Sequence, residues 1–258
     1  MTHSTLEFKL STLALNIAQQ VLCGEKETSG IDMFSIQLER TEECPICLDL
    51  LPYAQDECIM CHICGKSTCS TCSSEMKRTG FSLLCGLCNT DIPKYKEVFE
   101  KQAKKGLTKL FRKHHHPSAA NTLGNHHRSG GEGYSQSYAK SLYYYLHAAR
   151  WGDPAGYYNL GRAYGYGVEG YLPKDLNMCN RSMIVAAKMG DLYAHRDLFD
   201  KVCDNDDEQS RNCAISHAKI LAKMGCRESM QYLFLQYQKG YIVKDELTYI
   251  LREHGENM

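Results

Sequence analysis

Residues 153–171 read DPAGYYNLGRAYGYGVEGY, and residues 116–134 read HPSAANTLGNHHRSGGEGY. Laid over each other without a gap, at a shift of 37 residues, the two stretches share seven of nineteen residues, where unrelated sequences would share about one. Related copies follow at residues 186–199 (AAKMGDLYAHRDLF) and 222–234 (AKMGCRESMQYLF). The sequence therefore predicts an array of internal repeats.

Each copy places a small residue four positions before a leucine. These pairs are Ala119 and Leu123, Gly156 and Leu160, Ala194 and Leu198, and Ser229 and Leu233. Residues four apart share one face of a helix, so the pairs predict a stripe along which helices pack closely. Gly130 and Gly167 can end the first helices in a left-handed cap. We expect helical hairpins that must stack, because one hairpin cannot bury its apolar face alone.

The third copy departs from this pattern, because CDNDDEQSRNCA at residues 203–214 replaces the glycine turn. We expect its second helix to be displaced or shortened. The best copy, WGDPAGYYNLGRAYGYGVEGY followed by AAKMGD, resembles Sel-one-like repeats, which are relatives of the tetratricopeptide hairpin. The resemblance covers about residues 115–254 and implies an all-helical superhelix that serves as a protein-binding scaffold. GYIVKDELTYILREHG at residues 240–255 resembles a helix that caps such a stack.

A second feature is a cluster of cysteines, because nine of the fourteen lie within the 45 residues 44–88. Eight of them form Cys-x-x-Cys pairs, namely Cys44 and Cys47, Cys61 and Cys64, Cys69 and Cys72, and Cys85 and Cys88. Four pairs supply the eight thiolates that two tetrahedral zinc sites need. Structural thiols, disulfides or separate zinc knuckles are the alternatives. The gap of four residues between the second and third pairs favours interleaved sites over sequential ones.

This segment resembles an all-cysteine RING finger through CPICLDLLP, CGKSTCSTC and CGLC. The resemblance implies two Zn²⁺ ions held in a cross-brace. The first site would take Cys44, Cys47, Cys69 and Cys72, and the second Cys61, Cys64, Cys85 and Cys88. The family usually leaves one residue between its third and fourth ligands, a spacing that His62 would restore, with Cys61 or Cys58 then spare. We prefer Cys61, although both thiolate and imidazole bind zinc.

The resemblance also implies a function. A RING finger holds a ubiquitin-loaded conjugating enzyme against apolar residues, here Ile46, Leu83, Leu84 and Leu87. Core packing is the alternative role for these side chains. The sequence departs from the family at Gly86, where proline is common, and at Asn89, where a basic residue contacts ubiquitin. The expected function is therefore a ubiquitin ligase or ligase subunit whose repeats bind substrate or partner proteins, with a non-catalytic zinc-and-repeat adaptor as the alternative.

The composition limits the remaining function classes. Thirty basic residues balance thirty acidic ones, so the overall charge predicts no nucleic-acid partner. The basic stretch at residues 101–113 (KQAKKGLTKLFRK) is interpreted as the solvated face of a connecting helix, and the histidines at residues 114–116 and 126–127 as structural. No stretch is apolar enough for a membrane span. The start of the chain has no basic leading segment, so we expect a cytoplasmic or nuclear protein.

These observations predict a mainly α chain, in which a small zinc-stabilised RING-like domain precedes an α-solenoid of helical-hairpin repeats. An N-terminal helix and linker would occupy residues 1–40, the helix covering about residues 6–22. The finger would span residues 41–93 and a basic connecting helix residues 94–114. The solenoid with its capping helix would fill residues 115–258.

Overall fold

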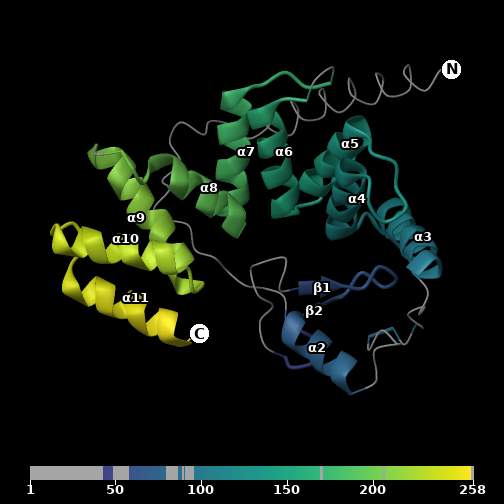
Figure 1. Cartoon of the computed structure of the whole chain (residues 1–258), viewed down its shortest axis with the longest axis horizontal. Coiled ribbons are helices and arrows are strands. Elements are labelled where there is room, and N and C mark those ends of the chain that lie inside the picture. The colour runs from purple at the N-terminus through teal and green to yellow at the C-terminus, as the bar shows by residue number, and fades with distance from the viewer. Residues whose placement is uncertain are drawn as a thin grey trace. The chain divides into compact units, whose positions relative to one another are not determined.

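A computed structural model describes residues 43–48, 58–79, 87–88, 90, 96–168, 171–205 and 207–256. Within them the chain forms two short strands and ten helices (Figure 1). They are β1 (Cys58–Met60), β2 (Ser67–Cys69), α2 (Ser70–Arg78), α3 (Lys96–His114), α4 (Pro117–Ser129), α5 (Tyr138–Arg150), α6 (Pro154–Tyr166), α7 (Leu176–Lys188), α8 (Leu192–Val202), α9 (Glu208–Lys223), α10 (Arg227–Gln238) and α11 (Lys244–Glu256). The helix predicted near residues 6–22 lies outside the described residues.

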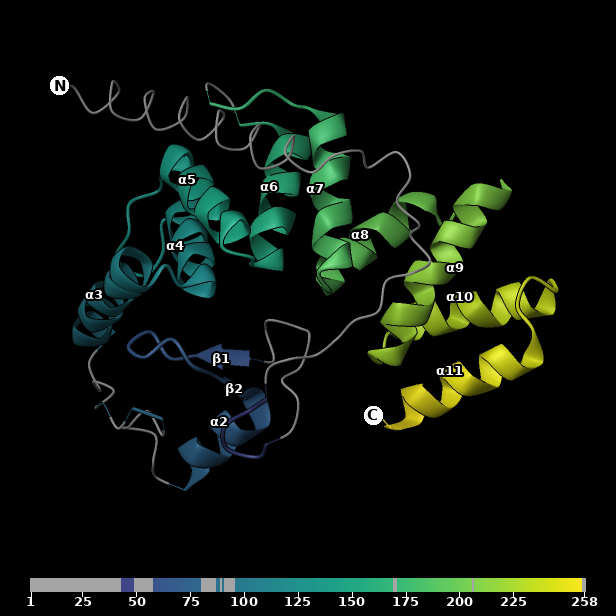
Figure 2. The same ribbon diagram turned by 180° about the vertical axis from the view of Figure 1, so that it is seen from behind.

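Consecutive helices pack against one another. The described residues up to Ala186 belong to one compact unit, unit 1, and those from Ala187 on belong to unit 2. In unit 1, α3 packs on α4, α4 on α5, and α5 on α6. In unit 2, α8 packs on α9, and α9, α10 and α11 lie side by side (Figure 1 and Figure 2). The chain is thus mainly helical, as predicted, and its order of contacts is consistent with a helical-repeat solenoid.

Capping residues place the ends of the repeat helices. Pro154 opens α6 after Asp153, whose Oδ1 accepts a hydrogen bond of 2.9 Å from the Ala155 N–H. Asp191 caps α8 in the same way, and such caps satisfy backbone donors that the first turn leaves unpaired. Gly130 follows α4 with φ +72° and donates its N–H to His126. The predicted left-handed glycine cap is therefore confirmed there.

The predicted stripe of small residues lies at the helix contacts. Ala119 and Ala194 are fully buried and Ser229 is 1% exposed, so the burial confirms the stripe at these positions. At Gly156 a Cβ atom would lie 2.4 Å from the backbone nitrogen of Ala149. The start of α6 therefore contacts the end of α5 backbone to backbone, an approach that only glycine permits.

The sequence predicted that the second helix of the third repeat is displaced or shortened, and only the first of these outcomes is found. It is displaced, but it is not shortened: α9 has 16 residues, against 13 in α5 and in α7. It begins early because Asp207 provides a cap, accepting a hydrogen bond of 2.8 Å from the Ser210 N–H. A capped short connection leaves more residues for the helix than a glycine turn does.

The core of unit 1 joins the first strand to the first helices. Leu107, Leu110 and Phe111 of α3 pack with Leu123 of α4, and Met60 of β1 packs against the same cluster. Phe111, a residue of this core, is surrounded by four aromatic rings from α5 and from the residue that caps its C-terminal end. Those rings are Tyr143, Tyr144, His147 and Trp151, with centroids 4.8–6.1 Å away. The cysteine-rich hairpin thus shares a core with the repeats.

The turn between β1 and β2 lies directly against α3. A Cβ atom at Gly106 would lie 2.1 Å from the carbonyl oxygen of His62, which is closer than any side chain can approach. On the other side of this turn, a Cβ atom at Gly65 would lie 2.7 Å from the ring of His116. Two glycines therefore allow the turn to lie between α3 and the start of α4.

Unit 2 contains a buried pair of histidines. The Nδ1 atoms of His195 on α8 and His217 on α9 lie 2.8 Å apart, so one ring donates to the other. The two side chains are 0% and 1% exposed. The pKa of each imidazole is lowered to about 4, by burial in both cases and, for His195, also by the neighbouring His217. The pair is therefore uncharged at neutral pH.

None of the described helices has an apolar stretch long enough to cross a membrane.

Gly106→Ala tests the contact between α3 and the β1–β2 turn. Alanine is the better helix former, so an unobstructed site would gain roughly 1 kcal/mol. We expect instead a loss of about 1–3 kcal/mol, because the methyl group would displace the turn. Thermal unfolding followed by the fluorescence of Trp151, which packs on Phe111, measures the change. Lys105→Ala, at an exposed position of the same helix, is the control, and a stabilised Gly106→Ala protein would contradict the contact.

The histidine pair predicts a loss of stability in acid. An unfolded histidine has a pKa near 6.5, whereas in the fold it is about 4. Unfolding therefore takes up protons as the pH falls from 6.5 to 4, and the free energy of unfolding falls with it. The loss is on the order of 3 kcal/mol per imidazole at most.

Far-UV circular dichroism during heating, repeated between pH 7.5 and 4.5, measures this slope. Replacing His195 and His217 together by leucine is expected to flatten it. His114→Leu, at an exposed position, should leave it unchanged. Equal slopes in all three proteins would show that the pair does not govern the acid sensitivity.

Candidate metal centre

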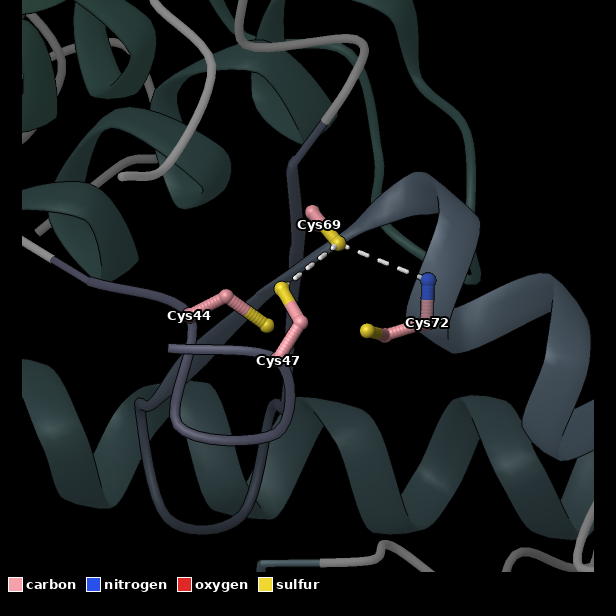
Figure 3. A group of neighbouring side chains, drawn as sticks. All are labelled: Cys44, Cys47, Cys69 and Cys72. Carbon is pink, nitrogen blue, oxygen red and sulfur yellow. Dashed lines mark hydrogen bonds between the residues drawn. The ribbon is translucent and has the colours of Figure 1, made fainter. Parts of the chain in front are cut away.

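Four cysteine sulfurs converge at the first group, which we call site 1. Cys44 and Cys47 come from the loop at residues 43–48, Cys69 ends β2, and Cys72 lies in the first turn of α2 (Figure 3). Their Sγ atoms all lie within 4.8 Å of one another. The strand and helix that follow one another directly thus deliver one pair, and the loop delivers the other.

Three sulfurs converge at the second group, site 2. Cys61 and Cys64 lie in the turn between β1 and β2, and Cys88 comes from the described residues that precede α3. The antiparallel pairing of Cys58 with Cys69 sets the register of this hairpin. Because the turn lies at one end of the hairpin and Cys69 at the other, the hairpin supplies ligands to both sites.

The first two Cys-x-x-Cys pairs share one local geometry. The N–H of Leu48 donates to the carbonyl of Cys44 at 2.9 Å, and the N–H of Gly65 donates to the carbonyl of Cys61 at 2.8 Å. The donor residue is left-handed in both turns, with φ +65° at Leu48 and +78° at Gly65. This backbone turn aims both sulfurs of a pair to the same side. Leucine adopts it at a cost of about 1–2 kcal/mol, which indicates that the surroundings hold the turn in place.

The sites alternate along the chain. The first and third pairs form site 1, while the second pair and Cys88 of the fourth form site 2. A metal at either site would therefore join segments more than 20 residues apart in sequence, since Cys47 pairs with Cys69 and Cys61 with Cys88. Such long-range links constrain the chain strongly when they close.

The sulfur separations fit a tetrahedral metal. The Sγ atoms of Cys47 and Cys69 lie 3.9 Å apart, as do those of Cys61 and Cys88. Four sulfurs bound to zinc at about 2.3 Å have separations of about 3.8 Å, the edge of a tetrahedron. A disulfide would bring two sulfurs to about 2.05 Å, and these cysteines form no disulfide with one another. The residues therefore fit a soft metal ion with tetrahedral thiolate coordination.

Backbone donors favour the thiolate form at site 1. Burial raises the pKa of Cys44, but hydrogen bonds from the backbone near Cys47, Cys69 and Ile46 outweigh burial and bring the pKa down to about 6. The N–H of Cys72 donates to the Cys69 sulfur at 3.4 Å. A side-chain hydrogen bond with Cys69 raises the pKa of Cys72, because it favours the protonated thiol, and the negative charge of Cys69 adds to this shift.

Site 2 has its own donors. The N–H of Ile63 points to the Cys61 sulfur at 3.4 Å, and the hydroxyl of Thr90 lies 3.2 Å from the Cys88 sulfur. The Ile63 amide stabilises the Cys61 thiolate, whereas the Cys88 thiol itself donates to the Thr90 hydroxyl oxygen. Once Cys88 has lost its proton, this hydroxyl can rotate and donate to the sulfur. The sequence did not single out Thr90. Its position two residues after the last cysteine is the signal that could have identified it.

The structure places Cys61, and not His62, beside Cys64 and Cys88. The His62 ring lies 6.3 Å from the ring of Phe99, and burial lowers its pKa. A protonated imidazole is thus disfavoured there, as expected for a side chain that packs against a helix. The eighth predicted ligand, Cys85, lies outside the described residues.

The predicted partner-binding residues are described in part. Ile46 is 41% exposed at the loop of site 1, and Leu87 is half-buried beside Cys88. Leu83 and Leu84 lie outside the described residues, as do Gly86 and Asn89. The sequence did not single out Leu48, which is 70% exposed beside Ile46. Like Gly65, Leu48 directly follows a Cys-x-x-Cys pair, and this position in the sequence could have identified it as the left-handed residue of its turn.

The other histidine cluster has structural roles. His127 is buried, its Nδ1 lies 3.1 Å from the carbonyl of Ser135, and its ring stacks on Tyr144. The His126 ring stacks on Tyr134 in the same way. In the described part of the chain these rings join no metal-ligand group.

No protein-family model matches this chain, and neither a curated protein nor a solved structure is significantly similar to it.

Removing one sulfur at each site should remove one metal ion at a time. We expect the purified protein to hold about two zinc ions, since two sets of thiolates converge. Cys69→Ser and Cys64→Ser should each lower this to about one, and the double variant should retain none.

Metal content by mass spectrometry and the charge-transfer absorption of the Co²⁺-substituted protein measure the change. Cys213→Ser is the control, because this half-buried cysteine of α9 belongs to neither group. An unchanged metal content in Cys69→Ser would contradict site 1, and iron in place of zinc would contradict the metal.

Proposed function

We propose that residues 41–93 form a RING-type finger with two structural zinc ions, and that this finger recruits a ubiquitin-conjugating enzyme. The repeats behind it, of Sel-one-like type, would bind the substrate or a partner protein. The chain would then act as a ubiquitin ligase or as a ligase subunit. Zinc would hold the fold of the finger and take no part in bond breaking.

The alternation of the two cysteine groups is the observation that supports this proposal most. Sequential zinc knuckles would use neighbouring pairs, whereas here the first pair groups with the third and the second with Cys88. A cross-brace holds two loops at a constant distance from each other. A rigid pair of loops is what a binding surface for a folded partner needs.

Exposed apolar side chains support a protein partner at the finger. Ile46 is 41% and Leu48 is 70% exposed on the loop that holds Cys44 and Cys47. Ile46 lies between the two cysteines of the turn and Leu48 directly follows the second, so the positions of both would be rigid once a metal is bound. Core packing, the alternative role considered for Ile46, does not account for this exposure.

The sequence at the end of the finger favours a second candidate. Gly86 replaces a common proline, and Asn89 replaces the basic residue that contacts ubiquitin in the family. A finger without that cation would bind a conjugating enzyme without holding its ubiquitin in the reactive conformation. The chain would then be an adaptor that assembles proteins and depends on another ligase for transfer.

The repeats would supply the choice of partner. Consecutive helices pack in both units, and stacked hairpins of this kind present extended surfaces made from several repeats. The surfaces carry exposed aromatic residues, among them Tyr166 at 78% and Tyr241 at 51%. Tyrosine is enriched where proteins bind one another.

A discharge assay with a panel of ubiquitin-loaded conjugating enzymes tests the ligase proposal. We expect the zinc-loaded protein to speed the release of ubiquitin to free lysine with at least one enzyme. Ile46→Ala should lower this rate by about tenfold or more, because truncating a central apolar anchor commonly costs 1–3 kcal/mol.

Ile59→Ala is the matched control, because Ile59 is also an isoleucine of the segment at residues 41–93, has 40% exposure and lies on β1, away from the loop that holds Ile46. Equal loss in both variants would point to the fold of the finger and not to a contact at Ile46. A zinc-loaded protein that is inactive with every conjugating enzyme, yet still binds one through Ile46, would establish the adaptor in place of the ligase.

A further inference from the structure

The exposed side of α3 carries a row of positive charges. Four lysines follow one another at intervals of four residues, so they lie on one side of the helix, about 6 Å apart along its axis. An arginine close to the last of them extends the row. We call these residues the basic face: Lys101, Lys105, Lys109, Arg112 and Lys113. All five are exposed, and an open hollow with a volume of about 510 Å³ lies along them.

The basic face has no acidic partners on its own helix. Glu97 and Glu100 both precede Lys101, and no later residue of α3 is acidic. In the described part of the chain, no hydrogen bond or ion pair joins a side chain of the basic face to another residue. Like charges four residues apart repel each other and destabilise a helix. The row therefore opposes the stability of α3, and a role in binding an anion accounts for its presence.

The opposite side of α3 holds the basic face in place. Leu107, Leu110 and Phe111 are buried in the core of unit 1, where α3 packs on α4. A helix that binds in the plane of a membrane surface inserts its apolar side among the lipids. The apolar side of α3 cannot do this, because the core already covers it. The basic face is thus a rigid surface that attracts its ligand by charge.

A row of aromatic side chains borders the basic face. Tyr143, His147 and Trp151 follow one another at intervals of four residues on α5 and at its C-terminal cap. The rings of all three lie 5.2–6.1 Å from the ring of Phe111. Phe111 lies three residues after Thr108, which lines the hollow, so the aromatic row lies at one edge of the basic face. All three side chains are half-buried, so part of each ring remains accessible.

We propose that the basic face binds the backbone of a single-stranded nucleic acid, whose bases stack on the aromatic row of α5. Proteins bind single strands by this combination, in which cations follow the phosphates and aromatic rings stack on the bases. Neither contact depends on the base sequence, and neither distinguishes RNA from DNA. The inference does not rest on the proposed ligase function.

The length of the row favours a nucleic acid over an acidic protein segment. Lys101 and Lys113 lie about 18 Å apart along the axis of α3. A nucleic-acid strand has a phosphate at every nucleotide and supplies negative charge over this whole length, whereas a protein segment has acidic side chains only at some positions.

The balance of 30 basic and 30 acidic residues, from which the sequence predicted no nucleic-acid partner, does not oppose this inference. At physiological salt, exposed charges act over only about 8 Å, so the local charge of α3 decides what it attracts. The interpretation of this stretch as a solvated face described the free protein and leaves open what binds to that face.

Fluorescence anisotropy with labelled single strands of about 20 nucleotides tests the proposal on the full-length protein. RNA and DNA of the same mixed sequence are compared; binding of either supports the proposal, and the tighter of the two identifies the natural strand. With five phosphate contacts, the logarithm of the association constant should fall with the logarithm of salt concentration at a slope of about −3.5. Lys105→Gln, Lys109→Gln should reduce the slope by about 1.4 and weaken binding at least about tenfold at 0.1 M salt.

Lys174→Gln, Lys239→Gln is the matched control, because it removes the same charge from exposed positions outside α3. It should change the dissociation constant less than twofold. Glutamine and lysine are similar helix formers, and the substitutions in α3 relieve repulsion between like charges. The α3 variant should therefore unfold at the same temperature as the natural protein or at a higher one, which separates lost binding from lost structure.

Trp151 gives a second readout, since it is the only tryptophan of the chain. A base that stacks on the aromatic row should quench its fluorescence as the strand binds. The same titration on the Lys105→Gln, Lys109→Gln variant should show quenching only at concentrations at least about tenfold higher.

Several outcomes would overturn the inference. Absence of binding at about 50 mM salt, where phosphate contacts are strong, is one. Equal losses in the α3 variant and in the control, or unchanged Trp151 fluorescence at saturation, are others. Tighter binding to duplex DNA, to polyglutamate or to vesicles of phosphatidylcholine and phosphatidylserine would assign the basic face to another ligand. Ubiquitin discharge should be unchanged in the α3 variant, so this inference and the ligase proposal can fail independently.

Discussion

At Gly156 the backbone of α6 runs so close to the end of α5 that a Cβ atom would lie 2.4 Å from the nitrogen of Ala149. This close approach is the constraint on which the rest of unit 1 depends. Because helices in contact through glycine and alanine are close, their polar side chains meet at the edges of the contact. The hydrogen bond between Asn159 and Asn121 is one result.

The cysteine-rich segment cannot depend on apolar packing as the repeats do. Among its described residues, no large apolar side chain is fully buried, whereas Cys44 is 0% exposed. So few buried apolar atoms cannot offset the entropy of ordering these loops. Coordination of a metal by the sulfurs can offset this entropy, so metal binding and folding would be coupled in this segment. The left-handed Leu48 agrees with this view, since a strained turn persists only where its surroundings hold it.

Among the described residues, the cysteine-rich segment meets the helices at the turn that holds Cys61 and Cys64. Gly106 of α3 lies against the backbone of this turn, and Met60 enters the core shared by α3 and α4. A ligand that orders the turn would therefore also stabilise the first helices of the repeats.

The sequence by itself determined the features that depend on local spacing. The repeat period placed Pro117 and Pro154 at the starts of their helices, and the small residues four before a leucine marked the packing stripe. The Cys-x-x-Cys pairs likewise predicted turns that could bind a metal, because such a turn closes through a hydrogen bond between residues four apart. Local hydrogen bonds and helix faces can be read from a sequence, since every participant lies within one or two turns of the chain.

Only the tertiary structure decided which distant residues meet. It placed Cys61 instead of His62 beside Cys88, and it paired His195 with His217. The hydrogen bond of 2.9 Å between Asn159 and Asn121 is a further case. At the repeat shift of 37 residues Asn159 corresponds to Thr122 and Asn121 to Tyr158, so no repeat pattern marks Asn159 and Asn121 as partners. Their meeting depends on the distances and angles between packed helices, which follow from the summed shapes of many side chains and not from any spacing along the chain.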